Sequence, residues 1–312
     1  MKKFIKTLFS AFFVFMLMAC GNGKSDKKVE DKGASGDKPT VTTTTSFLYD
    51  MTKQLAGDKV TVELIIPAGE DPHLYEAKPE DLEKLSSADL VLYHGLHFEG
   101  KMVDALEATG VAVAKNFTKE EIGEMDEGGQ MVVDPHFWFD IDLYKKAVDV
   151  AADELAKLTK DDSIREKAEE YKGELDKLDE YNRTELDKIS AESRYLITPH
   201  DAFNYFSRHY GMEVVAPQGV STDSEVSNTN IQETVDFIIE HKVKAIFAES
   251  TTDPARMEKI QEACKKQGFD VTVVQGEGEE LFSDSLAQEG KDGDNYIDMY
   301  KHNVDLMVKY LK

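Results

Sequence analysis

Cysteine is almost absent from this chain of 312 residues, which contains only Cys20 and Cys264. We expect Cys20 to be modified, as argued below, so Cys264 would be the only thiol left. The folded part of the chain would then contain no internal disulfide, even in an oxidising compartment. Because Cys264 lies in the helical pattern MEKIQEACKKQG, we interpret it as a buried core thiol rather than a reactive one.

Basic residues are a minority. The 37 Lys and Arg residues face 61 Asp and Glu residues, which gives a formal net charge of −24. Such a balance disfavours nucleic acid as a partner. The sequence also lacks the HExxH motif of zinc hydrolases and the Gly-x-Ser-x-Gly motif of serine hydrolases. We therefore expect a protein that is not an enzyme.

The chain has no hydrophobic run long enough to cross a bilayer. The uncharged stretch from Thr7 to Ala19 follows three lysines and is too short for a membrane span, so it predicts a signal peptide over residues 1–19. Its ending, Leu-Met-Ala-Cys, resembles a bacterial lipobox, in which Cys20 would be acylated; a plain secretory signal is the alternative. Residues 20–39 have no apolar period and would form a flexible tether. The protein would then be extracytoplasmic and lipid-anchored to the cell membrane.

From Thr40 onward, short apolar runs alternate with amphipathic stretches, which predicts an α/β fold with two lobes. Strands are expected in the first lobe at residues 41–45, 60–66, 90–93 and 111–114, and in the second at 195–198, 213–216, 245–248 and 271–274. Helices are expected near Phe47, Pro79 and Lys101, and over 201–209, 230–241 and 254–267. We place the lobes at residues 40–160 and 193–312.

Between the lobes, residues 141–157 and 162–190 are rich in Ala, Leu, Glu and Lys and predict helices. We expect the linker, residues 161–192, to form one long stiff helix. A coiled-coil partner helix is the alternative. The apolar positions form a single stripe, which is sufficient for packing on the chain's own lobes; they are Ile164, Ala168, Tyr171, Leu175, Leu178, Leu186 and Ile189.

Three of the eight histidines directly follow a proline, namely His73, His136 and His200. From residue frequencies, roughly 0.2 such pairs would be expected. Each pair follows an apolar run that reads as a strand, and proline stiffens the backbone there. Ligands gather at the carboxyl ends of strands in α/β sheets, so two facing lobes could bring the three imidazoles together around a metal ion.

A cation bound by three neutral imidazoles also needs a carboxylate, which balances its charge and fills the fourth ligand position. The first candidate is Asp284 in ELFSDSLAQEG, and the second is Glu249 in FAESTTDP. Asp71 and Asp134 each precede one of the histidines by two residues and could orient the imidazoles, or could be solvated loop acids.

Several segments, in this order, resemble the metal-binding solute-binding lipoproteins of bacterial ABC importers, the TroA-like family, over nearly all of residues 41–312. They are DPHLYEAKPEDLEKLSSADLVLYHGLHFEGKM, DPHFWFD, ITPHDAFNYFSRHYGMEV, QGVSTDSEVS, IFAESTTDP and ELFSDSLAQEG. The resemblance implies two Rossmann-like lobes joined by one rigid helix, with one Mn²⁺, Zn²⁺ or Fe²⁺ in the cleft between them. It also implies His73, His136, His200 and Asp284 as the ligands, and so decides against Glu249. His94 and His97 fall outside these positions, and we expect them at the surface or behind the ligands.

The resemblance implies that the ion is transported cargo, delivered to an ABC permease and its ATPase by a monomeric protein. Zinc-dedicated members usually carry a long histidine-rich loop before the second ligand histidine. The corresponding stretch here, TKEEIGEMDEGGQMVV, is short and has no histidine. We therefore place manganese first and zinc second, with iron as a further alternative. A secondary adhesin role is proposed for some members of this family, and nothing in the sequence tests it.

Overall fold

The computed structural model describes residues 38–127 and 129–312 of the chain. The predicted signal peptide, the lipidation site at Cys20 and almost all of the predicted tether lie outside the described residues. Within the described part, no helix is long and apolar enough to cross a membrane.

The first lobe is a four-stranded parallel sheet with strand order β2-β1-β3-β4. Its strands and helices alternate along the chain as the sequence predicts, although β4 is shorter than expected and continues as a 3₁₀ turn. The elements are β1 (Thr40–Thr43), α1 (Ser46–Ala56), β2 (Thr61–Leu64), α2 (Pro79–Ser87), β3 (Leu90–Tyr93), α3 (Val103–Thr109) and β4 (Val111–Ala112).

The second lobe contains two parallel strand pairs, β7 with β8 and β9 with β10. All four predicted strands are present, each within a residue or so of its expected bounds. A further helix, α9, was not predicted from the sequence. The elements are β7 (Tyr195–Ile197), α6 (Asn204–Tyr210), β8 (Glu213–Val215), α7 (Asn228–His241), β9 (Ala245–Phe247), α8 (Ala255–Lys266), β10 (Thr272–Val274) and α9 (Tyr296–Leu311).

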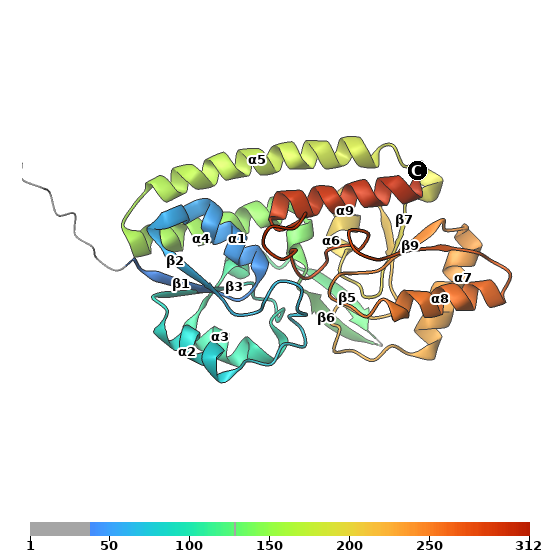
Figure 1. Ribbon diagram of the computed structural model, residues 1–312, viewed down its shortest axis with the longest axis horizontal. Coiled ribbons are helices and arrows are strands. Elements are labelled where there is room, and N and C mark those ends of the chain that lie inside the picture. The colour runs from blue at the N-terminus through green and yellow to red at the C-terminus, as the bar shows by residue number, and fades with distance from the viewer. Residues whose placement is uncertain (1–37, 128) are drawn as a thin grey trace, which may run out of the picture. The chain divides into compact units, whose positions relative to one another are not determined.

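One long helix joins the lobes. After α4 (Ile141–Thr159), α5 covers Ser163–Leu186, and its 24 residues span about 36 Å. Figure 1 shows α5 running from above α1 and α4 toward β7 of the second lobe, with α9 beneath it. Every apolar position of the predicted stripe is buried, and the helix packs on α4, α9 and α1 of its own chain. Packing within the chain, rather than a coiled coil, therefore covers this face.

The apolar run before His136 is a strand, as predicted, but it lies outside the parallel sheets. Residues 130–134 form β6 (Gln130–Asp134), which pairs antiparallel with β5 (Gly123–Glu127) in a separate hairpin. His136 therefore follows a hairpin strand and not a strand of a parallel sheet. The strands β5 and β6 follow one another with no helix between them. The alternation of strands and helices that predicts the lobes therefore does not predict this hairpin.

Short 3₁₀ turns complete the described elements: η1 (Gly57–Lys59), η2 (Gly100–Met102), η3 (Val113–Asn116), η4 (Phe137–Phe139) and η5 (Ala191–Ser193). The largest hydrophobic core is continuous between the lobes. For example, Phe139 stacks on Phe203 with ring centroids 4.4 Å apart. Cys264 is buried in a smaller core cluster of the second lobe, as predicted. A shared core and a long helix with one buried face together resist large movements between the lobes.

Candidate metal centre

Four side chains from distant parts of the sequence meet between the lobes. His73 lies in the loop after β2, His136 directly before η4, His200 after β7, and Asp284 in the loop between β10 and α9. Each offers one ligand atom, and these atoms all lie within 4.8 Å of one another. His73 is 5% exposed and the other three are fully buried. The structure thus brings together all four residues singled out from the sequence.

The carboxylate of Asp284 lies at the centre of this group. Its Oδ1 is 3.3 Å from His136 Nε2, and its Oδ2 is 3.1 Å from His200 Nε2 and 3.8 Å from His73 Nε2. Among the described residues, none of these five atoms has a hydrogen-bond partner, although all are buried. Unpaired buried polar atoms each cost about 1–3 kcal/mol. Five that converge on one point fit a shared cation, and three imidazole nitrogens with one carboxylate oxygen suit a divalent transition metal.

Two of the imidazoles are held by buried carboxylates. Asp134 Oδ1 accepts hydrogen bonds from the ring Nδ1–H and the backbone N–H of His136, at 2.8 and 3.0 Å. Glu249 Oε2 accepts from Nδ1–H of His200 at 2.5 Å. Since a carboxylate can only accept, the neutral form of each ring carries its proton on Nδ1, and Nε2 is the atom available to a metal. Glu249, the second candidate ligand from the sequence, therefore contacts His200 from behind. Asp134 orients His136, which is one of the two roles that the sequence left open for it.

His73 is held differently. Its ring packs edge-on against Phe98, with centroids 5.1 Å apart, and no side-chain carboxylate of the described residues contacts its Nδ1. Asp71 accepts a hydrogen bond from the backbone N–H of His73 at 2.9 Å. Of the two roles that the sequence left open for Asp71, neither describes it fully, because this carboxylate positions the backbone of His73 and not its ring.

The charges of the four residues are strongly coupled. Burial lowers the pKa of His73 to about 3, despite the opposing charge of Asp284. Burial also lowers the pKa of His136, but the hydrogen bond with Asp134 and the nearby carboxylate of Asp284 outweigh it and raise the pKa to about 9. The pKa of His200 is raised well above its usual value, because the charges of Glu249 and Asp284 outweigh burial. Burial raises the pKa of Asp284, but the nearby imidazoles of His200 and His136 outweigh burial and hold this pKa well below its usual value. Metal binding at this centre would therefore displace protons.

The two other histidines of the first lobe's YHGLHFEG segment take separate places. His94 is fully buried, and its Nε2 lies 2.7 Å from Thr45 Oγ1. It packs against Phe98, behind the ligand group. His97 is exposed, with a left-handed φ of 63°. Both positions agree with the expectation from the sequence.

Trp138 also supports the metal centre, and this role was not predicted from the sequence. Its Nε1–H donates to the backbone carbonyl of Ser283, next to Asp284, at 3.0 Å. The backbone N–H of Leu286, two residues after Asp284, donates to Ser46 Oγ at 2.9 Å. The loop that carries Asp284 is therefore fastened to the first lobe. The only tryptophan of the chain, two residues after a Pro-His pair, was the available signal.

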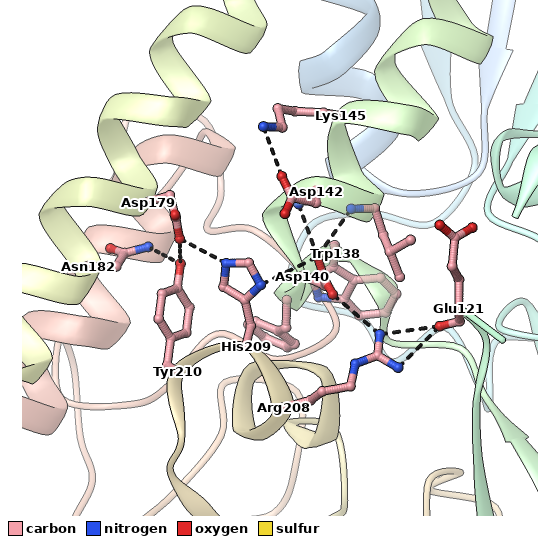
Figure 2. A network of polar contacts seen from close by, with 12 residues as sticks. Glu121, Trp138, Asp140, Asp142, Lys145, Asp179, Asn182, Arg208, His209 and Tyr210 are labelled. Atoms are coloured by element: carbon pink, nitrogen blue, oxygen red, sulfur yellow. Dashed lines mark hydrogen bonds and ion pairs between the residues drawn. The ribbon is translucent and has the colours of Figure 1, made fainter.

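A second group of acidic residues and histidine lies beside the linker helix. Figure 2 shows Asp140, Asp142 and His209, which lie close enough to share an ion. Here, however, Arg208 Nη2 lies 3.3 Å from Asp140 Oδ2, and His209 Nε2 lies 2.9 Å from Asp179 Oδ1. These contacts already pair the charges and tie α6 to the start of α4 and to α5. We interpret the group as a structural link between the elements.

Two α/β lobes joined by a long helix, with a buried cluster of three imidazoles and one carboxylate between them, define a metal-binding protein of the solute-binding type. Residues 41–310 match the family model described as "Zinc-uptake complex component A periplasmic". The chain belongs to this family of metal-binding substrate-binding lipoproteins of ABC importers. It is a family of transport proteins and not of enzymes.

Individual relatives agree with this assignment. The manganese-binding lipoprotein MntA of Bacillus subtilis is 38% identical over 308 residues, which cover 96% of this chain and 97% of the relative. The zinc-binding protein TroA of Treponema pallidum is 38% identical over 289 residues, which cover 90% and 91%. A solved TroA structure from work on metal-binding specificity superposes with a TM-score of 0.87 at 64% identity, and the match covers 88% of this chain and all of that one.

Proposed function

We propose that this protein captures one Mn²⁺ or Zn²⁺ ion outside the membrane and delivers it to the permease and ATPase of an ABC importer. His73, His136, His200 and Asp284 would be the ligands. The observation that carries the proposal is the convergence of five buried polar atoms, three Nε2 atoms and both oxygens of Asp284, without partners among the described residues. A site whose ligands all come from protein and are buried suits transport of an ion better than its use as a catalyst.

The choice of metal is the finer part of the proposal, and we place manganese before zinc. The segment that precedes His136 is the short hairpin β5–β6, which carries no histidine. The absence of histidine in this hairpin supports the prediction that the protein is not dedicated to zinc. The ligands themselves favour zinc, because three nitrogens and one carboxylate suit Zn²⁺. Nearly every such site also binds Zn²⁺ more tightly than Mn²⁺. The MntA of Bacillus subtilis and the TroA of Treponema pallidum are each 38% identical to this chain and bear different metals in their names.

The anchor is a further part of the proposal. Residues 1–19 would be the signal peptide, and Cys20 would carry the lipid that holds a monomeric protein at the cell membrane. Mass spectrometry of the peptide that begins at Cys20 should find acyl groups. A Cys20→Ala variant should be released into the medium, and retention of this variant at the membrane would refute the anchor.

Binding is tested with the soluble protein from Thr40 onward, stripped with a chelator. Its melting temperature is measured with Mn²⁺ and with Zn²⁺ added separately. At about 1,000 times the dissociation constant, an ion that binds only the folded state adds about 4 kcal/mol to the free energy of unfolding. We expect this gain for wild type and its loss in His73→Ala and Asp284→Ala. Uptake of the two metals by cells with and without the gene then identifies the cargo; unchanged uptake of both would refute transport.

A further inference from the structure

A short segment after β8, Gln218–Ser224, is braced by its own side chains, and we call it the strap. The amide Nε2–H₂ of Gln218 donates to the carbonyl oxygens of Thr222 and Ser224, at 2.8 and 2.7 Å. Gln218 and Thr222 are both buried. The strap is therefore a loop of defined conformation, and a movement of one of its ends would also move the other.

One end of the strap is joined to the ligand His200. The backbones of His200 and Gln218 form an isolated parallel β-bridge. Directly beside it, the backbone N–H of Asp201 donates to the carbonyl oxygen of Gly219 at 3.2 Å. A displacement of the strap would therefore act on the backbone that carries His200.

The other end reaches the first lobe beside the ligand His73. Thr222 Oγ1–H donates to Asp71 Oδ2 at 2.6 Å, and the second oxygen of Asp71 accepts the backbone N–H of His73 at 2.9 Å. The backbone N–H of Val220 also donates to Glu127 Oε1, on the hairpin, at 2.8 Å. One carboxylate, that of Asp71, thus connects the backbone of a ligand to the opposite lobe.

His73 depends on this contact more than the other histidines do. His136 and His200 each donate a ring N–H to a buried carboxylate. Among the described residues the ring of His73 has no such bond: it packs on Phe98 and on the other two imidazoles, and the backbone N–H of His73 donates to Asp71. It is also the only one of the three with any exposed surface, 5%. A ligand with the least support and the most exposure is the one expected to leave the ion first.

We propose that Thr222 and Asp71 are positioning residues that set the rate at which the ion dissociates. This inference rests on the proposed function and deepens it. The bond between Thr222 and Asp71 keeps His73 in place, and its opening frees His73 to swing away from the ion. Neither residue touches the ion itself.

The test compares dissociation rates of bound Zn²⁺, followed by stopped-flow mixing of the loaded protein with excess chelator. Thr222→Val removes the hydroxyl and nearly keeps the shape. Because the lost hydrogen bond has a charged acceptor, we expect dissociation to be about tenfold faster or more. Thr222→Ser keeps the hydroxyl and should restore a rate near that of wild type. Thr234→Val is a matched control, since Thr234 is also buried but bonds only to its own helix, at Asn230 O.

A second route uses Asp71→Asn, alone and combined with Thr222→Val. If Thr222 acts through Asp71, the double variant should dissociate little faster than the faster single variant. This route also keeps the inference testable if Thr222→Val folds poorly. The melting temperature of the metal-free protein is measured alongside, because a purely structural role would lower it without changing the rate.

The outcomes are distinct. Binding in wild type with equal dissociation rates in wild type, Thr222→Val and Asp71→Asn would overturn the inference and leave the proposed function intact. Failure of Thr222→Ser to restore the rate would also overturn it. A wild-type protein that binds neither Zn²⁺ nor Mn²⁺ would overturn the proposed function, and the inference with it.

Discussion

Replacing Glu249 with glutamine should weaken metal binding by about 10-fold, at the lower end of the 10- to 100-fold range for partners of ligand histidines. Glu249 Oε2 accepts from His200 Nδ1–H at 2.5 Å, and both side chains are fully buried. Glutamine is nearly isosteric and can still accept through its amide oxygen. The ring orientation would then be kept, while the negative charge behind it is lost.

The magnitude follows from that difference. A hydrogen bond to a charged group contributes about 1.5–3 kcal/mol, and a neutral one about 0.5–1.5 kcal/mol. The expected loss is therefore about 1–1.5 kcal/mol, which corresponds to roughly 5- to 13-fold in the dissociation constant. Glu249→Ala removes the hydrogen bond as well, so its loss of metal affinity should approach about 100-fold.

The assay is a competition titration of Zn²⁺ between the protein and a chromogenic chelator of known affinity. Glu262→Gln changes the net charge equally at an exposed position of α8 and serves as the control. An affinity of Glu249→Gln equal to that of wild type and of Glu262→Gln would refute the role of Glu249. Equal losses in both variants would show a general effect of charge instead.

Three further predictions concern other parts of the molecule. Trp138→Phe removes the hydrogen bond to Ser283 O, so metal affinity should fall about 3- to 10-fold in the same titration; an unchanged affinity would contradict the role of Trp138 in holding the Asp284 loop. Leu175→Ala, in the buried face of α5, should lower the free energy of unfolding by about 2–5 kcal/mol in denaturant titrations and leave the affinity unchanged; a smaller loss would mean that α5 is not packed as described. Burial raises the pKa of Asp50 to about 6, although Tyr296 N–H donates to it. Between about pH 4 and 6 the native state then binds more protons than the unfolded chain, so stability rises as the pH falls. From pH 7 to 5, metal-free wild type should gain about 1 kcal/mol relative to Asp50→Asn, and parallel pH profiles would refute this.

Much of this protein can be predicted from local patterns in its sequence. The β-branched runs specify strands, and the spacing of apolar residues along α5 specifies which of its faces is buried, because both depend on residues a few positions apart. The Pro-His pairs mark three ligand positions for the same reason, since proline restricts only its immediate neighbours. Asp284 was a candidate from its place after a strand, and the family resemblance favoured it over Glu249.

Other features depend on contacts between residues far apart in the sequence, and only the folded chain decides them. Glu249 and Asp134 are both acids near strand ends, yet which histidine each one holds is set by the packing of the lobes. The bond between Thr222 and Asp71 spans 151 positions, and that between Trp138 and Ser283 spans 145. Local preference carries no information on such pairs. The sequence by itself therefore determined which residues could bind a metal, and the tertiary structure decided how firmly each of them is held.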